Sequence, residues 1–525
     1  MKPDLSAYPE IPPGCLVNEN KIFNLFQIYK NVKTVDPETG KTKYIRETVG
    51  SIKNGVFTFS KTYLLKKENI ELASKLHTEG KSEDEKSVSS SSSDNNEPNS
   101  EKQVCTKIDE ALKKTSFDQR DSSKIEIPML TIVLGSIISA LAGDTGCTEI
   151  SEAINGRLKK YFNDNNMGDL VVDNCSHDTV RKAFLLVEAD TLSELYTELI
   201  KPLIKEDFRV IAADGQALRA TGKTTPENNG KHGAYMLMNF YDATNRVCLY
   251  HKLIQKKENE ISVGPEALNK LNLTNSVVTA DAMSCQIDFV NTVIGKGAHY
   301  CLSLKGNQNK SFDEVRYLFN STPKNQIISY EPEITKEHGR IEQYKISLIS
   351  GRRLSKIIKE KWLGLDDGSI VKVERNSYQQ TTKNNTCEER FYITSLPPID
   401  ENSKRVNEII RHHWGIENNL HWCLDMRYNQ DRIQANNPNY IANRSALNKL
   451  ALAYLENYRY WLWNKGREKE KLSLNILQKR CYDPKAALEC IACSLGYYSQ
   501  PLKVPKLTTP PFPHRGGASF LSTAR

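Results

Sequence analysis

The sequence lacks an apolar segment long enough to cross a lipid bilayer. Its longest uncharged run is the 17-residue stretch 127–143, whereas a spanning helix needs about 20 apolar residues. The run also contains Pro128, Gly135 and Gly143. We therefore expect it to form a buried helix within a helical domain, and we expect no membrane partner.

A disulfide framework and a strong charge of one sign are also missing. No secretory signal precedes the twelve cysteines, which are scattered from Cys15 to Cys493, so we expect a reducing cytoplasmic compartment. Cys490 and Cys493 have the spacing of half a zinc site, but no second pair follows them. The net charge of +8 permits a polyanionic partner without requiring one.

The first 205 residues divide into three parts by composition. Segment 1–76 mixes short β-favouring runs with turn signals, which indicates an accessory β-rich segment. Segment 77–122 is polar, with nearly unbroken serine from 87 to 93, and predicts a disordered linker because it has too little apolar surface to bury. Helical periodicity over 123–205 predicts a helical domain, a candidate for DNA binding.

The remainder alternates between strand-like and helix-like patterns, which is typical of a mixed α/β sheet flanked by helices. Segment 206–324 is the first part of this domain, and 325–402 is a β-rich insertion. Segment 403–465 is predicted to complete the domain with the helix that carries Glu417 and the helix that follows it. Segment 466–525 is predicted as a C-terminal helix with a basic, Pro-rich tail.

The helix-like stretch 411–425 places a carboxylate on an apolar face. At about 100° per residue, Ile410, Glu417 and Leu424 fall on one arc. An unpaired buried carboxylate costs several kcal/mol, so Glu417 is expected to have a cation, hydrogen bonds or a bound metal ion as its partner.

Two aspartates supply further acids at what the pattern predicts to be strand ends. Asp214 follows the apolar run 208–213, and Asp281 follows the run 276–280. Each alone is more typical of a turn, but together with Glu417 they are three hard oxygen ligands from separate elements. Such ligands suit Mg²⁺ or Mn²⁺, and a pair of these ions supports phosphodiester displacement.

Five motifs in order resemble the H-repeat-associated insertion-sequence transposases, over roughly residues 125–460. The motifs are Ile211-Ala-Ala-Asp214-Gly215-Gln-Ala-Leu218-Arg219, Val278-Thr-Ala-Asp281-Ala282-Met283, Leu304-Lys305-Gly306-Asn307-Gln308, His338-Gly339-Arg340-Ile341-Glu342 and Arg411-x-His413-Trp414-x-Ile416-Glu417-Asn418-x-Leu420-His421-Trp422-x-Leu424-Asp425. The chain departs from the family at Gln216 and Ala220, where Lys and Gly are usual, and at Leu424, where Lys is expected.

The resemblance implies an RNase H-like catalytic domain of the DDE type, with Asp214, Asp281 and Glu417 as catalytic and metal-binding residues. It implies Mg²⁺ or Mn²⁺ as cofactor, with two ions per site. It also implies hydrolysis of DNA at element ends, strand transfer of the 3′-hydroxyl into target DNA, and a homodimer acting on chromosomal DNA.

Several further residues are candidates for supporting roles. His421 and Asp425 follow Glu417 closely and are expected to support the metal site. Basic and polar residues within the motifs are candidate DNA contacts, with plain surface charge as the alternative. These are Arg219, Lys305, Asn307, Arg340, Arg411 and His413.

Two other functions use the same residues. His413, Glu417 and His421 are spaced four apart, so a zinc-dependent hydrolase is an alternative that leaves Asp214 and Asp281 without a role. The second alternative is a catalytically decayed or co-opted relative of a transposase that binds DNA without cutting it.

Overall fold

The computed structural model describes most of the chain from residue 100 onward and parts of the segment before it. The described residues are 5–9, 11–20, 25–35, 42–53, 56–59, 100–121, 123, 125–204, 208–224, 231–254, 260–337, 340–379, 382–467 and 472–498. The chain divides into two units, residues 1–95 and 96–525. The serine-rich part of the predicted linker and the predicted Pro-rich tail lie outside the described residues.

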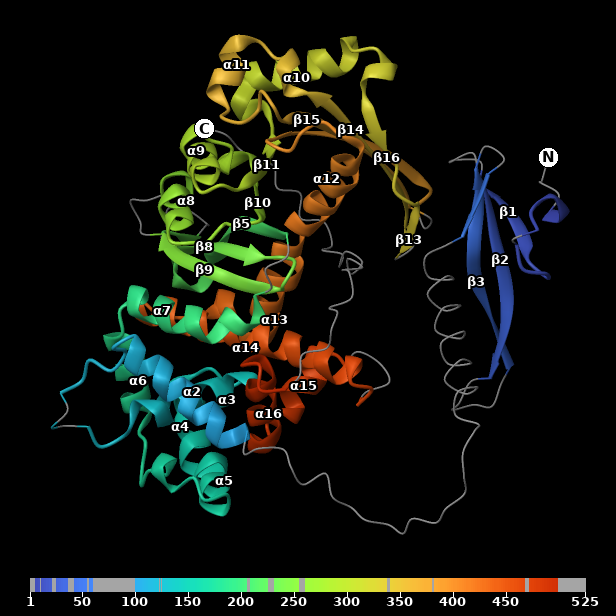
Figure 1. Cartoon of the computed structure of the whole chain (residues 1–525). Helices are drawn as coiled ribbons and strands as arrows, with labels where there is room; N and C mark the ends of the chain where they lie inside the picture. Colours follow the sequence, from blue (N-terminus) through green and yellow to red (C-terminus); the bar gives the residue numbers. More distant parts are fainter. Residues whose placement is uncertain are drawn as a thin grey trace, which may run out of the picture. The chain divides into compact units, whose positions relative to one another are not determined.

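The first unit contains a four-stranded antiparallel sheet with the order β1-β2-β3-β4 (Figure 1). Its strands are β1 Leu16–Asn20, β2 Leu25–Val35, β3 Thr42–Lys53 and β4 Val56–Phe59. Ile28, Val49 and Ile52 form its buried centre. All four strands lie inside the segment predicted to be β-rich.

The second unit begins with a helical domain. Its helices are α2 Ser100–Lys114, α3 Met129–Leu141, α4 Cys147–Ala153, α5 Lys159–Asp164, α6 His177–Leu186 and α7 Ala189–Ile200. Helix α3 comes from the long uncharged run and is almost entirely buried, as predicted. Among the described residues, no helix has the length and apolarity needed to cross a membrane.

Helix α2 corrects the predicted linker. Residues 100–114 were assigned to the disordered segment 77–122, but they form a helix that packs against α3, α7 and α16. Val104, Ile108 and Leu112 are buried in the main core. Their spacing of four places them on one helical face. The prediction relied on composition, and the many charged residues between these three made the segment look too polar to pack.

The rest of the second unit contains a ten-stranded mixed sheet with the order β12-β14-β15-β16-β11-β10-β5-β8-β9, in which β13 pairs with β14 (Figure 1). Strands β5, β10 and β11 are mutually parallel, and the other neighbours are antiparallel. The first strands of this sheet are β5 Arg209–Leu218, β8 Tyr235–Asp242, β9 Val247–Ile254, β10 Ser276–Ala280 and β11 His299–Leu304. Between β5 and β8 in the sequence, β6 Lys223–Thr224 and β7 Lys231–His232 form a separate two-stranded sheet. The predicted mixed α/β sheet is confirmed.

The predicted β-rich insertion extends the same sheet. Its strands are β12 Ile328–Tyr330, β13 Thr335–Glu337, β14 Arg340–Ser350, β15 Ser369–Gln379 and β16 Asn384–Thr394. Strand β16 pairs with β11, which joins the insertion to the parallel centre of the sheet. The helices α10 Asn309–Ser321 and α11 Lys356–Lys361 accompany it.

Helices cover both faces of the sheet. Helix α12, Asp400–His413, packs through Val406 and Ile409 on a face that includes Val210 and Val277. Side chains alternate between the two faces along a strand, so Ile211 and Val278 lie on the opposite face. That face packs with α8 Glu260–Asn269 and α9 Ile287–Gly295. The centre of the sheet is therefore buried on both sides.

Helix α14, Pro438–Asn464, is the seam between the helical domain and the sheet. It contacts α3, α6 and α7 on one side and β9 on the other. Nearly every residue from Ile441 to Tyr458 is buried, because the helix has protein on all sides. The remaining helices are α13 Trp422–Tyr428, α15 Leu474–Arg480 and α16 Pro484–Ser494.

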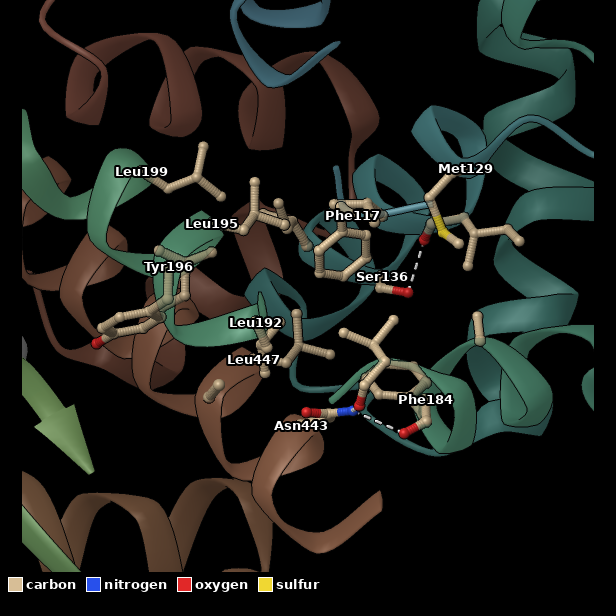
Figure 2. Close-up of a pocket in the computed structure, with 17 residues that line it drawn as sticks. Phe117, Met129, Ser136, Phe184, Leu192, Leu195, Tyr196, Leu199, Asn443 and Leu447 are labelled. Atoms are coloured by element: carbon tan, nitrogen blue, oxygen red, sulfur yellow. Dashed lines mark hydrogen bonds between the residues drawn. The ribbon is translucent and has the colours of Figure 1, made fainter. Parts of the chain in front are cut away.

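A cavity of about 70 Å³ lies where α14 meets α3, α6 and α7. Figure 2 shows Phe117, Met129 and Leu195 around it, with the Asn443 side chain at its edge donating to Phe184 O at 2.7 Å. Its walls are almost wholly apolar, and none of the candidate site residues lines it. The cavity is a packing void at the seam.

Truncating the buried face of α2 tests the corrected assignment. Ile108→Ala should destabilise the protein by about 2–5 kcal/mol, since Ile108 is fully buried and its loss leaves a cavity. Lys102→Ala, at an exposed position of the same helix, should change stability by less than about 0.5 kcal/mol. Urea unfolding of the full chain measures both, and equal effects would contradict the packing of α2.

Candidate active site

Asp214 and Asp281 lie side by side on adjacent parallel strands. Ala213 of β5 is paired with Ala280 of β10, so the two aspartates occupy the next position in register, where neighbouring strands are about 4.8 Å apart. Asp281 directly follows β10, as predicted. Asp214 was expected to end its strand, but β5 continues to Leu218 because it pairs with β8 along this length.

Glu417 reaches the same region from a distorted helix. We predicted one continuous helix with Glu417 on its buried stripe, but α12 ends at His413 and a π-helical turn, η11, covers Ile416–His421 before α13 begins. The wider turn changes the phase of the helix, so Ile416 and Leu420 are buried while Glu417 is exposed. The expectation that Glu417 is buried is therefore wrong.

The charges of the three acids act on one another. Burial, which has the largest effect, and the negative charges of Asp281 and Glu417 together raise the pKa of Asp214 from its ordinary value of 3.8 to about 8. A fourth acid, Glu260, adds to this effect. Carboxylates from four separate elements thus share one region in which like charges repel.

His421 lies beside Asp214 as a neutral group. Its Nδ1 is 3.6 Å from Asp214 Oδ2, and burial lowers the pKa of His421 to about 3, with Lys449 acting in the same direction. Asn239, the fully buried residue paired with Asp214 across β5 and β8, lies with its Nδ2 3.0 Å from His421 Nε2. Donation by this amide leaves the proton on Nδ1, so His421 turns an N–H toward Asp214.

His413 lies at a different side of the site. Burial lowers the pKa of His413 to about 4, the charge of Asp281 opposes this shift, and that of Lys305 adds to it. Its buried Nδ1 has no hydrogen-bond partner among the described residues. Because of the π-turn, residues four apart between His413 and His421 no longer share one helical face, and no three His, Cys, Asp or Glu side chains in the described ranges are grouped to hold a metal ion of any kind.

Side-chain amides hold the turn that carries Asp281. Asn307 Nδ2 donates to Ala282 O at 2.7 Å, and Gln308 Nε2 donates to Cys285 O at 2.9 Å. Lys361 Nζ in turn donates to Gln308 Oε1 at 2.6 Å. The Leu304–Gln308 motif therefore fixes the backbone next to Asp281. A DNA contact by Asn307 stays a prediction.

A chain of buried amides ends on Asp425. Asn448 Nδ2 donates to Gln430 Oε1, Gln430 Nε2 donates to Gln216 Oε1, and Gln216 Nε2 donates to Asp425 Oδ1, at 3.1, 3.0 and 2.9 Å. These contacts tie β5 to α13 and α14. Gln216, one of the departures from the family pattern, thus provides a donor to Asp425.

The basic candidates for DNA contact are spread along the sheet. Lys305 is exposed just after β11, and its charge acts on His413. The Arg411 guanidinium lies 5.9 Å from the ring centre of Tyr344 on β14. Arg340 starts the same strand, about 13 Å from Tyr344 at the usual rise per residue. Arg219 is exposed at the far end of β5. His338 and Gly339 lie outside the described residues.

Sequence reasoning missed Glu260 and Asn239. Glu260 comes from a charged run, 256–260, that is typical of a solvated surface. Asn239 lies within an apolar strand and becomes informative only when the register of β5 and β8 is known. Neither residue has a local signal, because both depend on pairing between distant segments.

The donor set fits a divalent cation. Among the described residues, no ready-made group of three metal-ligating side chains is present. However, the charges of other acids act on Asp214, and His421, which lies 3.6 Å from its carboxylate, is neutral. Carboxylate oxygens in this number are the ligands that Mg²⁺ and Mn²⁺ prefer, and a cation would relieve the repulsion. Asp214, Asp281 and Glu417 are the residues that would hold it.

Known proteins resemble the chain over the same region. Residues 205–455 match the family described as Transposase DDE domain. The protein YncI of Escherichia coli O157:H7 is 27% identical over 398 residues, which cover 74% of this chain and 95% of that protein. The H repeat-associated protein YhhI of Escherichia coli K12 is 26% identical over 369 residues, covering 68% and 93%. Both carry provisional transposase names.

The raised pKa of Asp214 predicts a pH-dependent effect of its substitution. The folded protein keeps a proton on Asp214 up to about pH 8, whereas the unfolded chain loses it near pH 4, so stability falls as the pH rises between these values. Asp214→Asn cannot ionise and should gain thermal stability over the wild type as the pH rises from 4 to 8. Melting in EDTA measures this, and a pH-independent difference would contradict it.

Asn307→Ala separates backbone support from DNA contact. Loss of a bond of ~1 kcal/mol should raise amide hydrogen exchange at residues 282–285 about fivefold in the absence of DNA. Asn309→Ala, at an exposed position two residues later, should leave this exchange unchanged. If Asn307→Ala weakens DNA binding without altering the exchange, the amide acts on DNA instead of on the turn.

Proposed function

We propose that this chain is a DDE-type transposase of the H-repeat-associated kind, which cuts DNA at the ends of its own insertion sequence and joins the freed 3′ ends to target DNA; its similarity to the Transposase DDE domain family and to YncI and YhhI supports this. The proposed catalytic residues are Asp214, Asp281 and Glu417. The family supports DNA as the partner and a divalent metal ion as the cofactor.

The gathering of acids from separate elements is the observation that carries this proposal. Asp214 and Asp281 are neighbours in register, and the charges of Asp281 and Glu417 act on Asp214. Structural stability gives no reason to bring like charges together in a partly buried place, since each raises the cost of ionising the next. A site that binds cations during function does give such a reason.

The residues of the chain bind and orient the reacting groups. Two divalent ions, when bound, would activate the attacking oxygen and stabilise the leaving oxygen of an in-line displacement at phosphorus. Asn239 holds His421, whose ring lies 3.6 Å from the Asp214 carboxylate. Asn307 and Gln308 keep Asp281 fixed at the end of β10. Catalysis in this account depends on position and charge, without a protein nucleophile.

Basic residues of the sheet would position the DNA backbone. The charges of Lys305 and Asp281 both act on His413. Arg411 of α12 lies 5.9 Å from the ring centre of Tyr344 on β14, and Arg340 begins that strand. Phosphate contacts fix the register of a protein on a duplex without reading its sequence. Since two ends must be joined, we expect a homodimer on DNA.

Substitution of each acid tests the proposal. With DNA that carries the element's own ends and with Mg²⁺ or Mn²⁺, Asp214→Asn, Asp281→Asn and Glu417→Gln should each lower the cleavage rate by about a hundredfold or more, because each removes charge that positions the metal. Gel analysis of strand cleavage measures the rates. Asp288→Asn, which changes an exposed acid in the first turn of α9, is the matched control.

The outcomes discriminate between functions. Full cleavage by all three variants would overturn the assignment of the acids. Specific binding to the ends without any cleavage by the wild type would instead indicate a decayed or co-opted DNA-binding protein. Cleavage that depends on zinc and is lost in His413→Ala would favour the hydrolase alternative.

A further inference from the structure

Glu260 lies against the first catalytic strand in a way that depends on a glycine. It begins α8, and its carboxylate lies over the Cα of Gly215, the residue after Asp214. A Cβ atom at position 215 would collide with the Glu260 carboxylate. With any other residue at this position, the flexible Glu260 side chain would have to move away.

The position of α8 brings Glu260 close to the second aspartate as well. Helix α8 contacts strand β8 and the turn η7, Ala282–Ser284, which directly follows Asp281. Burial raises the pKa of Glu260, and the charge of Asp281 adds to the shift. Glu260 is therefore near both Asp214 and Asp281, and it reaches them from a different element than Glu417 does.

The start of a helix alone does not explain this arrangement. An acid in the first turn interacts favourably with the helix dipole from an exposed position, without approaching other acids. Glu266 of the same helix shows the ordinary arrangement, because it is paired with Lys252 near the surface. The charge of Glu260 instead acts on Asp214, and the charge of Asp281 acts on Glu260, which is unfavourable without a cation.

Resting on the metal-dependent function proposed above, we propose that Glu260 is a fourth carboxylate of the metal site and completes the shell of the ion shared by Asp214 and Asp281. Four carboxylates and two divalent cations carry equal and opposite charge. Mg²⁺ and Mn²⁺ take six oxygen ligands, so a fourth carboxylate replaces a water without crowding the shell. Glu417 then approaches from η11 and Glu260 from α8.

Direct binding of Mn²⁺ to the full chain, without DNA, tests the proposal independently of activity. Glu260→Gln should weaken Mn²⁺ binding about tenfold or more, measured from the electron paramagnetic resonance signal of the free ion. Glu266→Gln on the same helix should bind like the wild type. In EDTA, Glu260→Gln should melt no lower than the wild type, because the substitution removes a repelling charge.

Gly215→Ala provides a second route to the same test. The added methyl group should displace Glu260 and weaken Mn²⁺ binding in the wild-type background. In the Glu260→Ala background the same substitution should have no further effect, because the group it displaces is gone. Additive losses in this double-mutant cycle would overturn the proposal.

The result separates this inference from the proposed function. If Asp281→Asn loses Mn²⁺ affinity while Glu260→Gln keeps it, the metal site stands without a fourth carboxylate. If both variants bind Mn²⁺ like the wild type, the metal site itself is wrong and the proposed function fails with it.

Discussion

Repulsion between carboxylates at the centre of the sheet is the constraint on which the site depends. The parallel pairing of β5 with β10 brings Asp214 next to Asp281, and the π-turn brings Glu417 toward them. Burial and these neighbours raise the pKa of Asp214 to about 8. In the proposed function, a bound cation would offset this repulsion and allow Asp214 to ionise.

Much of the surrounding structure holds this arrangement in place. The amides of Asn307 and Gln308 fix the Asp281 turn, and Asn239 fixes the neutral His421 beside Asp214. Helix α14 is buried between the helical domain and the sheet and carries Asn448, the start of the amide chain to Asp425. Rigid support of this kind keeps ligands oriented while the charge around them changes.

The sequence was sufficient where the signal is local. Apolar runs predicted β5 and β10, and Asp281 follows β10 as predicted, whereas Asp214 lies within β5 and not at its end. Glu417 was identified from a helical periodicity that does not exist, since a π-turn replaces the regular helix there. Helix α2 was missed because its narrow apolar face is recognisable only from the distant segments that it packs against. Glu260 was missed because its place near the site depends on the contact of α8 with β5.

Anomalous X-ray scattering from crystals of the full chain soaked in Mn²⁺ tests the central claim most directly. The account predicts Mn²⁺ peaks between Asp214, Asp281 and Glu417, at about 2.0–2.2 Å from the carboxylate oxygens, as expected for octahedral oxygen ligation. Peaks elsewhere in the chain, with these three side chains unchanged and without a nearby ion at saturating Mn²⁺, would contradict it.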